Sequence, residues 1–251
     1  MTYRARCTAL VFVGLWLLWS PAAAAEAPPS SDWPDLSGQW AVEQTNTAHS
    51  QVPVVGTLTS TTTAKLLVDI EQQGANLRLH STTCSVDIED ATTLVRTILP
   101  DRFVNSIPST TRRGRLVDDN GHFELQLPRN YMVHGARFDD IREEAMPDDD
   151  SDPRVEDQDG DGNPGVTVKI EGIVSGDIYV VQRSWDAWRG RIENPDTITG
   201  VLHWGVEQSI LGASTRFLRI QPKTQADEDP TQNPFSMRRL DGGDTECRDL
   251  R

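Results

Sequence analysis

The chain has 251 residues, of which 38 are acidic and 24 are lysine or arginine, so its formal net charge is −14 at pH 7. A chain this acidic repels phosphate backbones, which argues against a nucleic-acid partner. The length exceeds the commonest size of one domain, but antiparallel barrels and sandwiches of this length often fold as a single domain.

Residues 1–25 have the three-part layout of a secretory signal peptide. A basic start with Arg4 and Arg6 is followed by an apolar run, then by Pro21 and four alanines. The apolar run has about 11 residues, whereas a membrane-spanning helix needs roughly 20. A retained membrane anchor is the alternative. No second long apolar run follows, so we expect a periplasmic or extracellular protein without a membrane span.

Residues 26–35 are rich in proline and serine, and we expect them to be flexible, although Trp33 is a candidate for packing onto the folded domain. Alternation of apolar and polar residues begins at Leu36. Alternation recurs at residues 65–71, 77–81 and 166–171, and further candidate strands follow at residues 92–98, 114–117, 122–127, 131–138, 178–184, 197–211 and 214–221. Many short strands separated by turn signals predict an all-β fold. We expect an antiparallel barrel or sandwich that forms a single domain over residues 36–224.

An acidic insertion, residues 139–165, interrupts this pattern. Between Asp139 and Asp161 it holds twelve acidic and two basic residues. Such a segment cannot bury apolar surface, so we expect a long acidic surface loop outside the sheet. Residues 225–251 also lack a period and predict an irregular C-terminal tail.

Cys84 and Cys247 are the cysteines that remain once a leader containing Cys7 has been removed. In an oxidising compartment, two cysteines allow one pairing. We therefore expect a Cys84–Cys247 disulfide that ties the tail to the β domain, with two separate buried thiols as the alternative.

The insertion ends in DQDGDGNPG, residues 157–165, which resembles the EF-hand loop and related aspartate-rich calcium repeats. The resemblance implies a calcium site with Asp157, Asp159, Asp161 and the main-chain carbonyl of Asn163 as ligands. The chain departs from the EF-hand pattern at Val168, which occupies the position of the bidentate glutamate. A distant carboxylate would have to replace it, and the nearby options are Asp150, Asp152, Glu156 and Glu171. An ion-free acidic loop is the alternative.

The first predicted strand contains Gly38-x-Trp40, which resembles the G-x-W signature of lipocalin-type barrels. In that family the tryptophan closes one end of the barrel under an arginine from the last strand. The resemblance implies a lipocalin-like barrel, with Arg216 or Arg219 as the arginine.

Trp185 and Trp188 lie three residues apart beside Arg183. Together they are candidates for a ligand site, because indole rings stack on sugars or aromatic ligands and an arginine recognises polar groups. A turn whose tryptophans cap the barrel is the alternative.

The sequence contains no G-x-S-x-G elbow, glycine-rich phosphate loop or H-E-x-x-H zinc motif. This favours a secreted or periplasmic non-catalytic β-barrel that binds a small molecule or has a structural role in the cell envelope. The alternative is a secreted hydrolase that acts on carbohydrate, lipid or ester. An apolar cavity inside the barrel would favour the first class, whereas two convergent carboxylates or a Ser–His contact in a pocket would favour the second.

Overall fold

The computed structural model describes residues 33–52, 56–242 and 245–250, which belong to the compact unit Trp33–Arg251. The predicted signal peptide and residues 26–32 lie outside the described residues. The pairings between the named strands are all antiparallel, so the prediction of an antiparallel all-β fold is confirmed. Within these ranges, no helix has the length and apolar character needed to cross a membrane.

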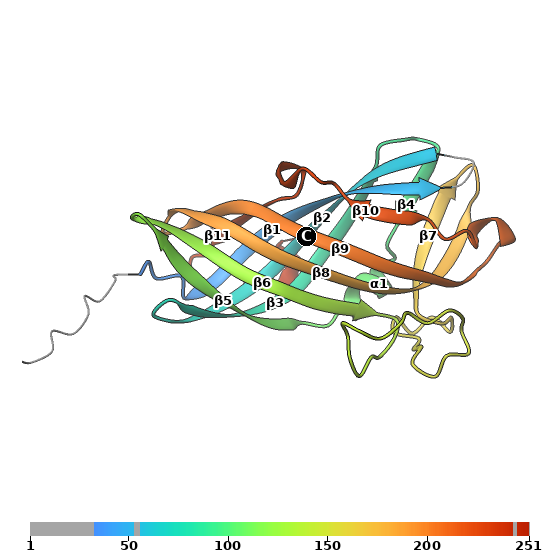
Figure 1. Ribbon diagram of the computed structural model, residues 1–251, viewed down its shortest axis with the longest axis horizontal. Coiled ribbons are helices and arrows are strands. Elements are labelled where there is room, and N and C mark those ends of the chain that lie inside the picture. The colour runs from blue at the N-terminus through green and yellow to red at the C-terminus, as the bar shows by residue number, and fades with distance from the viewer. Residues whose placement is uncertain (1–32, 53–55, 243–244, 251) are drawn as a thin grey trace, which may run out of the picture. The chain divides into compact units, whose positions relative to one another are not determined.

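Eight strands form a closed, barrel-like ring. They are β1 (Gly38–Val52), β2 (Gly56–Gln73), β3 (Asn76–Asp90), β5 (Thr110–Asp119), β6 (His122–His134), β8 (Gly176–Asn194), β9 (Thr197–Ala213) and β11 (Pro234–Arg239). Around the ring their order is β8, β6, β5, β3, β2, β1, β11 and β9, and β9 pairs back with β8. Figure 1 shows the long strands wound side by side.

Three short strands extend the sheet beyond this ring: β4 (Val95–Ile98), β7 (Val166–Gly172) and β10 (Lys223–Ala226). The strands β6 and β7 occupy successive places along β8, and β11 and β10 do the same along β1. The ring strands are therefore continued toward the end where the short helix α1 (Asp101–Ser106) lies, and the acidic insertion emerges between β6 and β7 (Figure 1).

The β5–β6 turn shows how local sequence sets strand pairing. Asn120 and Gly121 both have positive φ, 55° and 85°. A two-residue hairpin of the type that matches strand twist requires this conformation, and asparagine followed by glycine adopts it at the lowest cost. Asn120 and Gly121 therefore form the turn that joins β5 to β6.

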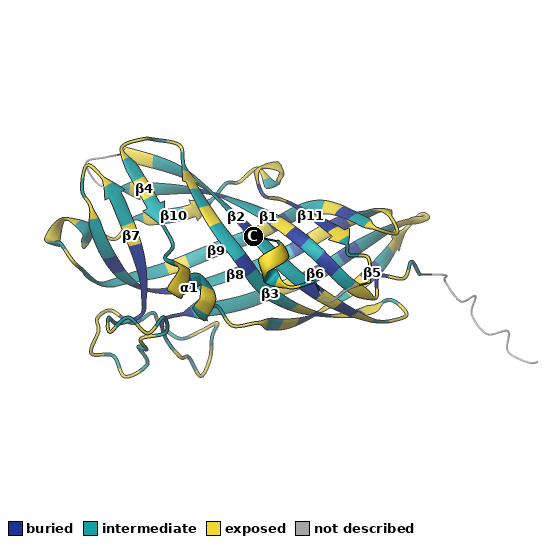
Figure 2. Ribbon diagram, turned by 180° about the vertical axis from the view of Figure 1, so that it is seen from behind, coloured by how far each residue is buried: buried dark blue, intermediate teal, exposed yellow. Residues whose placement is uncertain are grey.

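Buried apolar side chains form two clusters, and Figure 2 shows buried positions alternating with more exposed ones along the strands. The larger cluster lies inside the ring and includes Trp40, Leu79, Leu125, Ile198 and Met237. The smaller cluster joins Phe103 of α1 to Val166, Val168, Ile178 and Val180 of β7 and β8. The interior between the clusters contains polar side chains, which are described below.

The C-terminal region differs from the predicted irregular tail. Residues 234–239 form β11, which pairs with both β1 and β9 and so completes the ring. Its two buried residues, Phe235 and Met237, do alternate, but the strand is too short and too polar to stand out from the surrounding sequence. The strand predicted at residues 214–221 is wrong, because Arg216–Leu218 form a turn of 3₁₀ helix.

The predicted disulfide between Cys84 and Cys247 is present, and it ties the chain end beyond β11 to β3. Cys84 is an extra residue in β3 where the β2–β3 register shifts, because Lys65 pairs with Ser85 and Leu66 with Thr83. Such a bulge turns one side chain out of the regular alternation.

The N-terminal segment is also more ordered than predicted over residues 33–35. The side-chain amide of Gln72 accepts a hydrogen bond from Leu36 N at 2.7 Å and donates one to Pro34 O at 2.9 Å. Trp33 packs against Phe123, with ring centroids 5.5 Å apart. These contacts fix the chain immediately before β1.

Candidate functional site

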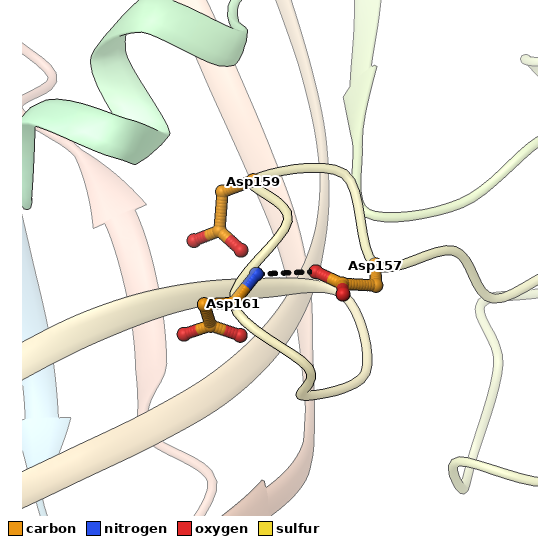
Figure 3. A group of neighbouring side chains, drawn as sticks. All are labelled: Asp157, Asp159 and Asp161. Carbon is orange, nitrogen blue, oxygen red and sulfur yellow. Dashed lines mark hydrogen bonds between the residues drawn. The ribbon is translucent and has the colours of Figure 1, made fainter.

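The aspartate loop brings three carboxylates together. One ligand oxygen from each of Asp157, Asp159 and Asp161 lies within 4.8 Å of the others. Figure 3 shows the carboxylate of Asp157 turned toward the main-chain N–H of Asp161, which donates to it at 3.0 Å. Gly162 N donates to the other Asp157 oxygen at 2.8 Å. The loop curls because its own N–H groups are bound by the first aspartate, and Gly162 accommodates the curl with a φ of +88°.

The three carboxylates do not share one electrostatic environment. Burial raises the pKa of Asp159, and the charges of Asp161 and Asp157 raise it further. Its Oδ1 is buried without a hydrogen-bond partner in the protein. Burial also acts to raise the pKa of Asp161, but hydrogen bonds from Thr167 and Asn163 outweigh it, and the net pKa is lowered. Bringing these charges together costs free energy that a bound cation would offset.

The positive charge nearest to this cluster comes from α1, where Arg102 Nη1 lies 3.8 Å from Asp161 Oδ2. Three of the more distant carboxylates proposed as further ligands form salt bridges with basic side chains instead. Asp152 pairs with Arg154, Glu156 with Arg137, and Glu171 with Lys169 and Arg96. Asp150 is exposed. Within the described part of the chain, the metal-compatible group therefore consists of the three aspartates, with Asn163 at the same turn.

The residues Arg183, Trp185 and Trp188 all lie in β8 and not in a turn. Positions three apart in a strand face opposite sides, and the structure separates the two tryptophans accordingly. The Trp185 ring lies 3.6 Å from the guanidinium carbon of Arg129, and Arg183 pairs with Glu207 and donates to Ile141 O and Glu144 O. Trp188 instead lines the interior of the ring. The two indoles therefore do not face a shared ligand.

A cavity of about 240 Å³ lies inside the ring and is lined by residues of both apolar clusters. Its lining follows the strand alternation, with Gln44 and Asn46 on β1 and every second residue from Gln182 to Trp188 on β8. Apolar side chains from the larger cluster, among them Val68, Leu79, Leu127 and Met237, line one side. Phe103 and Ile107, at α1, line the other.

Arg112 and Asp186, which both line the cavity, form an ion pair. Arg112 Nη1 donates to Asp186 Oδ1 at 2.5 Å, and Arg112 Nη2 donates to Pro128 O at 2.7 Å. The two side chains are 8 % and 15 % exposed. The carbonyl of Pro128 is available because β6 has an irregularity between Leu127 and Asn130. A pair held this way keeps both charges compensated inside the protein.

Several polar atoms of the cavity residues are buried without a hydrogen-bond partner in the protein. Arg112, His134 and Trp188 are only 9 %, 6 % and 7 % exposed. Their unpartnered atoms are Arg112 Nε, His134 Nδ1 and Trp188 Nε1. Two acceptor oxygens, Gln44 Oε1 and Asn46 Oδ1, are also unpartnered. Such atoms are rare in folded proteins unless water or a ligand binds them, because leaving them unpaired raises the free energy of the site.

His134 ends β6 at the α1 side of the cavity. Its ring contacts the edge of Phe103, with ring centroids 5.5 Å apart. Burial lowers the pKa of His134 to about 4, because the cation loses its hydration. The imidazole is therefore neutral at pH 7.

Trp40, near the start of β1, belongs to the larger apolar cluster. It is fully buried, its Nε1 donates to Leu36 O at 2.9 Å, and the guanidinium carbon of Arg239 lies 4.5 Å from its ring centroid. The arginine over Trp40 is thus Arg239 of β11, not Arg216 or Arg219 as expected. Arg216 lies instead against Phe217.

Sequence reasoning missed the polar residues of the cavity, although a signal for them exists. Arg112 is in phase with Gly114 and Leu116, and Asp186 is in phase with Trp188. Extending the predicted strands by a few residues would have placed both charges on buried faces. Comparisons with protein-family models, with curated proteins and with solved structures found no match for this chain.

Proposed function

We propose that this chain is an exported, non-catalytic protein that binds a small molecule inside its ring of strands. The observation that carries the proposal is the 240 Å³ cavity lined by apolar side chains and by buried polar atoms without protein partners. A concave, mainly apolar site with a few convergent polar groups is typical of ligand pockets. The resemblance of Gly38-x-Trp40 to lipocalin-type barrels supports the same function, and the leader pattern and the disulfide support export.

Binding is favoured over the hydrolase because of what lines the cavity. Among the described residues around it, Asp186 is the single carboxylate, and its Oδ1 is bound to Arg112. A glycosidase needs two carboxyl groups, and an esterase needs an activated nucleophile beside a base. The cavity supplies recognition groups and not these catalytic pairs.

A fragment screen with a matched pair of variants tests this function. Ala64→Phe places a ring inside the cavity, whereas Ala41→Phe makes the same change at a position of β1 outside the cavity lining. A ligand at ten times its Kd stabilises the fold by about 1.4 kcal/mol, which a thermal-shift assay detects. We expect small-molecule hits that disappear in Ala64→Phe and persist in Ala41→Phe. A screen without hits, or hits that Ala64→Phe leaves unchanged, contradicts the function.

We also propose that calcium orders the acidic insertion through Asp157, Asp159 and Asp161. The clustered carboxylates and the buried, unpartnered Asp159 Oδ1 support this. Calcium accepts flexible cages of carboxylate and carbonyl oxygens, whereas magnesium requires a stricter octahedral geometry. The ion would complete its coordination with main-chain carbonyls and water.

The test compares two triple aspartate-to-asparagine variants with equal charge changes in the same insertion. One replaces Asp157, Asp159 and Asp161, and the other replaces the exposed Asp148, Asp149 and Asp150. Calcium at one to ten times its Kd should stabilise the protein by about 0.4 to 1.4 kcal/mol, and magnesium by less. Only the first variant should lose this response. A calcium shift no larger than that of potassium chloride at equal ionic strength would leave the loop as an ion-free connector.

A further inference from the structure

We propose that the ligand of the interior cavity is an uncharged, mainly apolar molecule that presents an acceptor oxygen to Arg112 and Trp188. The inference rests on the proposed function and specifies the class of ligand. It follows from the size of the cavity, its balance of charge, and the two N–H donors of Arg112 and Trp188 that are left without a partner.

The size of the cavity limits the ligand to a small molecule. At about 240 Å³ it exceeds the roughly 150 Å³ cavity that accommodates benzene, and it is smaller than most pockets for drug-sized ligands, which start at about 300 Å³. A substituted aromatic ring or a short branched chain fits this volume. Its apolar part would contact Leu66, Val68, Leu79 and the ring of Trp204.

The charge balance of the cavity selects an uncharged ligand. Arg112 and Asp186 are the two formally charged residues among the described lining residues, and they neutralise each other. His134 adds no charge at neutral pH. A carboxylate ligand would leave a net negative charge in a buried site, beside a carboxylate that already occupies the guanidinium. An ammonium ligand would leave a net positive charge.

The unpartnered donors select an acceptor oxygen. Two of the three nitrogens of the Arg112 guanidinium are engaged, Nη1 by Asp186 and Nη2 by Pro128 O, which leaves the Nε–H free. The Nε1–H of Trp188 is likewise free, and the guanidinium carbon lies 5.5 Å from the Trp188 ring centroid. Both groups only donate hydrogen bonds. A carbonyl or hydroxyl oxygen accepts from them without adding charge.

Three probes of similar shape separate these requirements: ethylbenzene has no acceptor, acetophenone has an uncharged carbonyl, and benzoate has an anionic carboxylate. Affinities are measured by titration of the ¹⁵N-labelled protein, following the indole N–H signals by NMR. We expect acetophenone to bind about ten- to a hundredfold more tightly than ethylbenzene, because ethylbenzene leaves the donors unpaired. Benzoate should bind more weakly than acetophenone, and the Trp188 indole signal should shift with acetophenone.

Substitutions in β8 test whether the Trp188 donor and the Asp186 charge cause the preference for acetophenone. Trp188→Phe keeps an aromatic ring but removes one donor, so it should weaken acetophenone binding about tenfold and leave ethylbenzene binding unchanged. Trp185→Phe is the matched control on the outer face of β8 and should change neither. Asp186→Asn leaves Arg112 as an uncompensated cation and should reverse the preference, so that benzoate binds more tightly than acetophenone.

The outcomes distinguish the ligand class from the binding function. Equal binding of ethylbenzene and acetophenone, tightest binding of benzoate to the unaltered protein, or a loss in Trp188→Phe that is the same for both uncharged probes would overturn the ligand class. If none of the three probes binds while the fragment screen gives cavity hits, the ligand class fails and the binding function stands. If the fragment screen also fails, both fail. Should Asp186→Asn not fold, the Trp188→Phe and Trp185→Phe comparison still decides the role of the donors.

Discussion

Replacing His134 by glutamine should remove a specific part of the pH dependence of stability. The buried imidazole has a pKa of about 4, against 6.5 for an exposed histidine. Between pH 6.5 and pH 4 this histidine is protonated in the unfolded chain but stays neutral in the folded protein. The contribution of His134 to the free energy of unfolding is therefore fully present above pH 6.5 and is lost as the pH falls toward 4.

The magnitude follows from the shift, because each pKa unit corresponds to about 1.4 kcal/mol. The free energy of unfolding should thus fall by about 3 kcal/mol more in the unaltered protein than in His134→Gln between pH 7 and pH 4. Urea denaturation at pH 7, 5.5 and 4 measures it, and the difference between the two proteins cancels the titration of the carboxylates. Parallel pH profiles for the two proteins would refute the view that burial keeps this imidazole neutral.

Two further predictions concern stability. Mutating both cysteines to serine opens a loop with a sequence separation of 163 residues. In the chain-entropy model this should lower the free energy of unfolding by about 5 kcal/mol. Urea denaturation measures the change, and a loss below about 1 kcal/mol would contradict the prediction. Gly165→Ala should destabilise the fold much more than Gly160→Ala in a thermal melt, because both have positive φ but only at Gly165 would a Cβ lie 2.3 Å from Val180 O. Equal destabilisation by the two substitutions would show that the backbone near Val180 moves to accommodate the added methyl group.

Local patterns in the sequence carry a large part of this fold. The strands β1, β2, β3, β5, β6, β7 and β9 fall on stretches where apolar and polar residues alternate, because the period of a strand is two whatever its neighbours are. The disulfide could be predicted without geometry, since removal of the predicted leader would leave two cysteines. The three aspartates meet because they lie within five residues of one another, so their proximity is also a local property.

Other features depended on which strands meet. A polar residue on the inner face of a strand looks the same in the sequence as one on the outer face, so nothing in the sequence indicated that Gln44 and Asn46 line a cavity. The same holds for Trp185 and Trp188, which the sequence grouped and the strand separates. β11 was missed because a strand of six residues becomes recognisable only through its pairing with β1 and β9.

The sequence alone determined an acidic, antiparallel β protein with one disulfide and one aspartate loop, because alternation, composition and cysteine number are local or additive properties. Only the tertiary structure decided that Arg112 and Asp186, 74 residues apart, form a buried pair beside a cavity, and that Arg239 covers Trp40. The physical reason is ring closure. An inside exists only once β9 pairs with β8, and that closure decides which polar side chains lose their water.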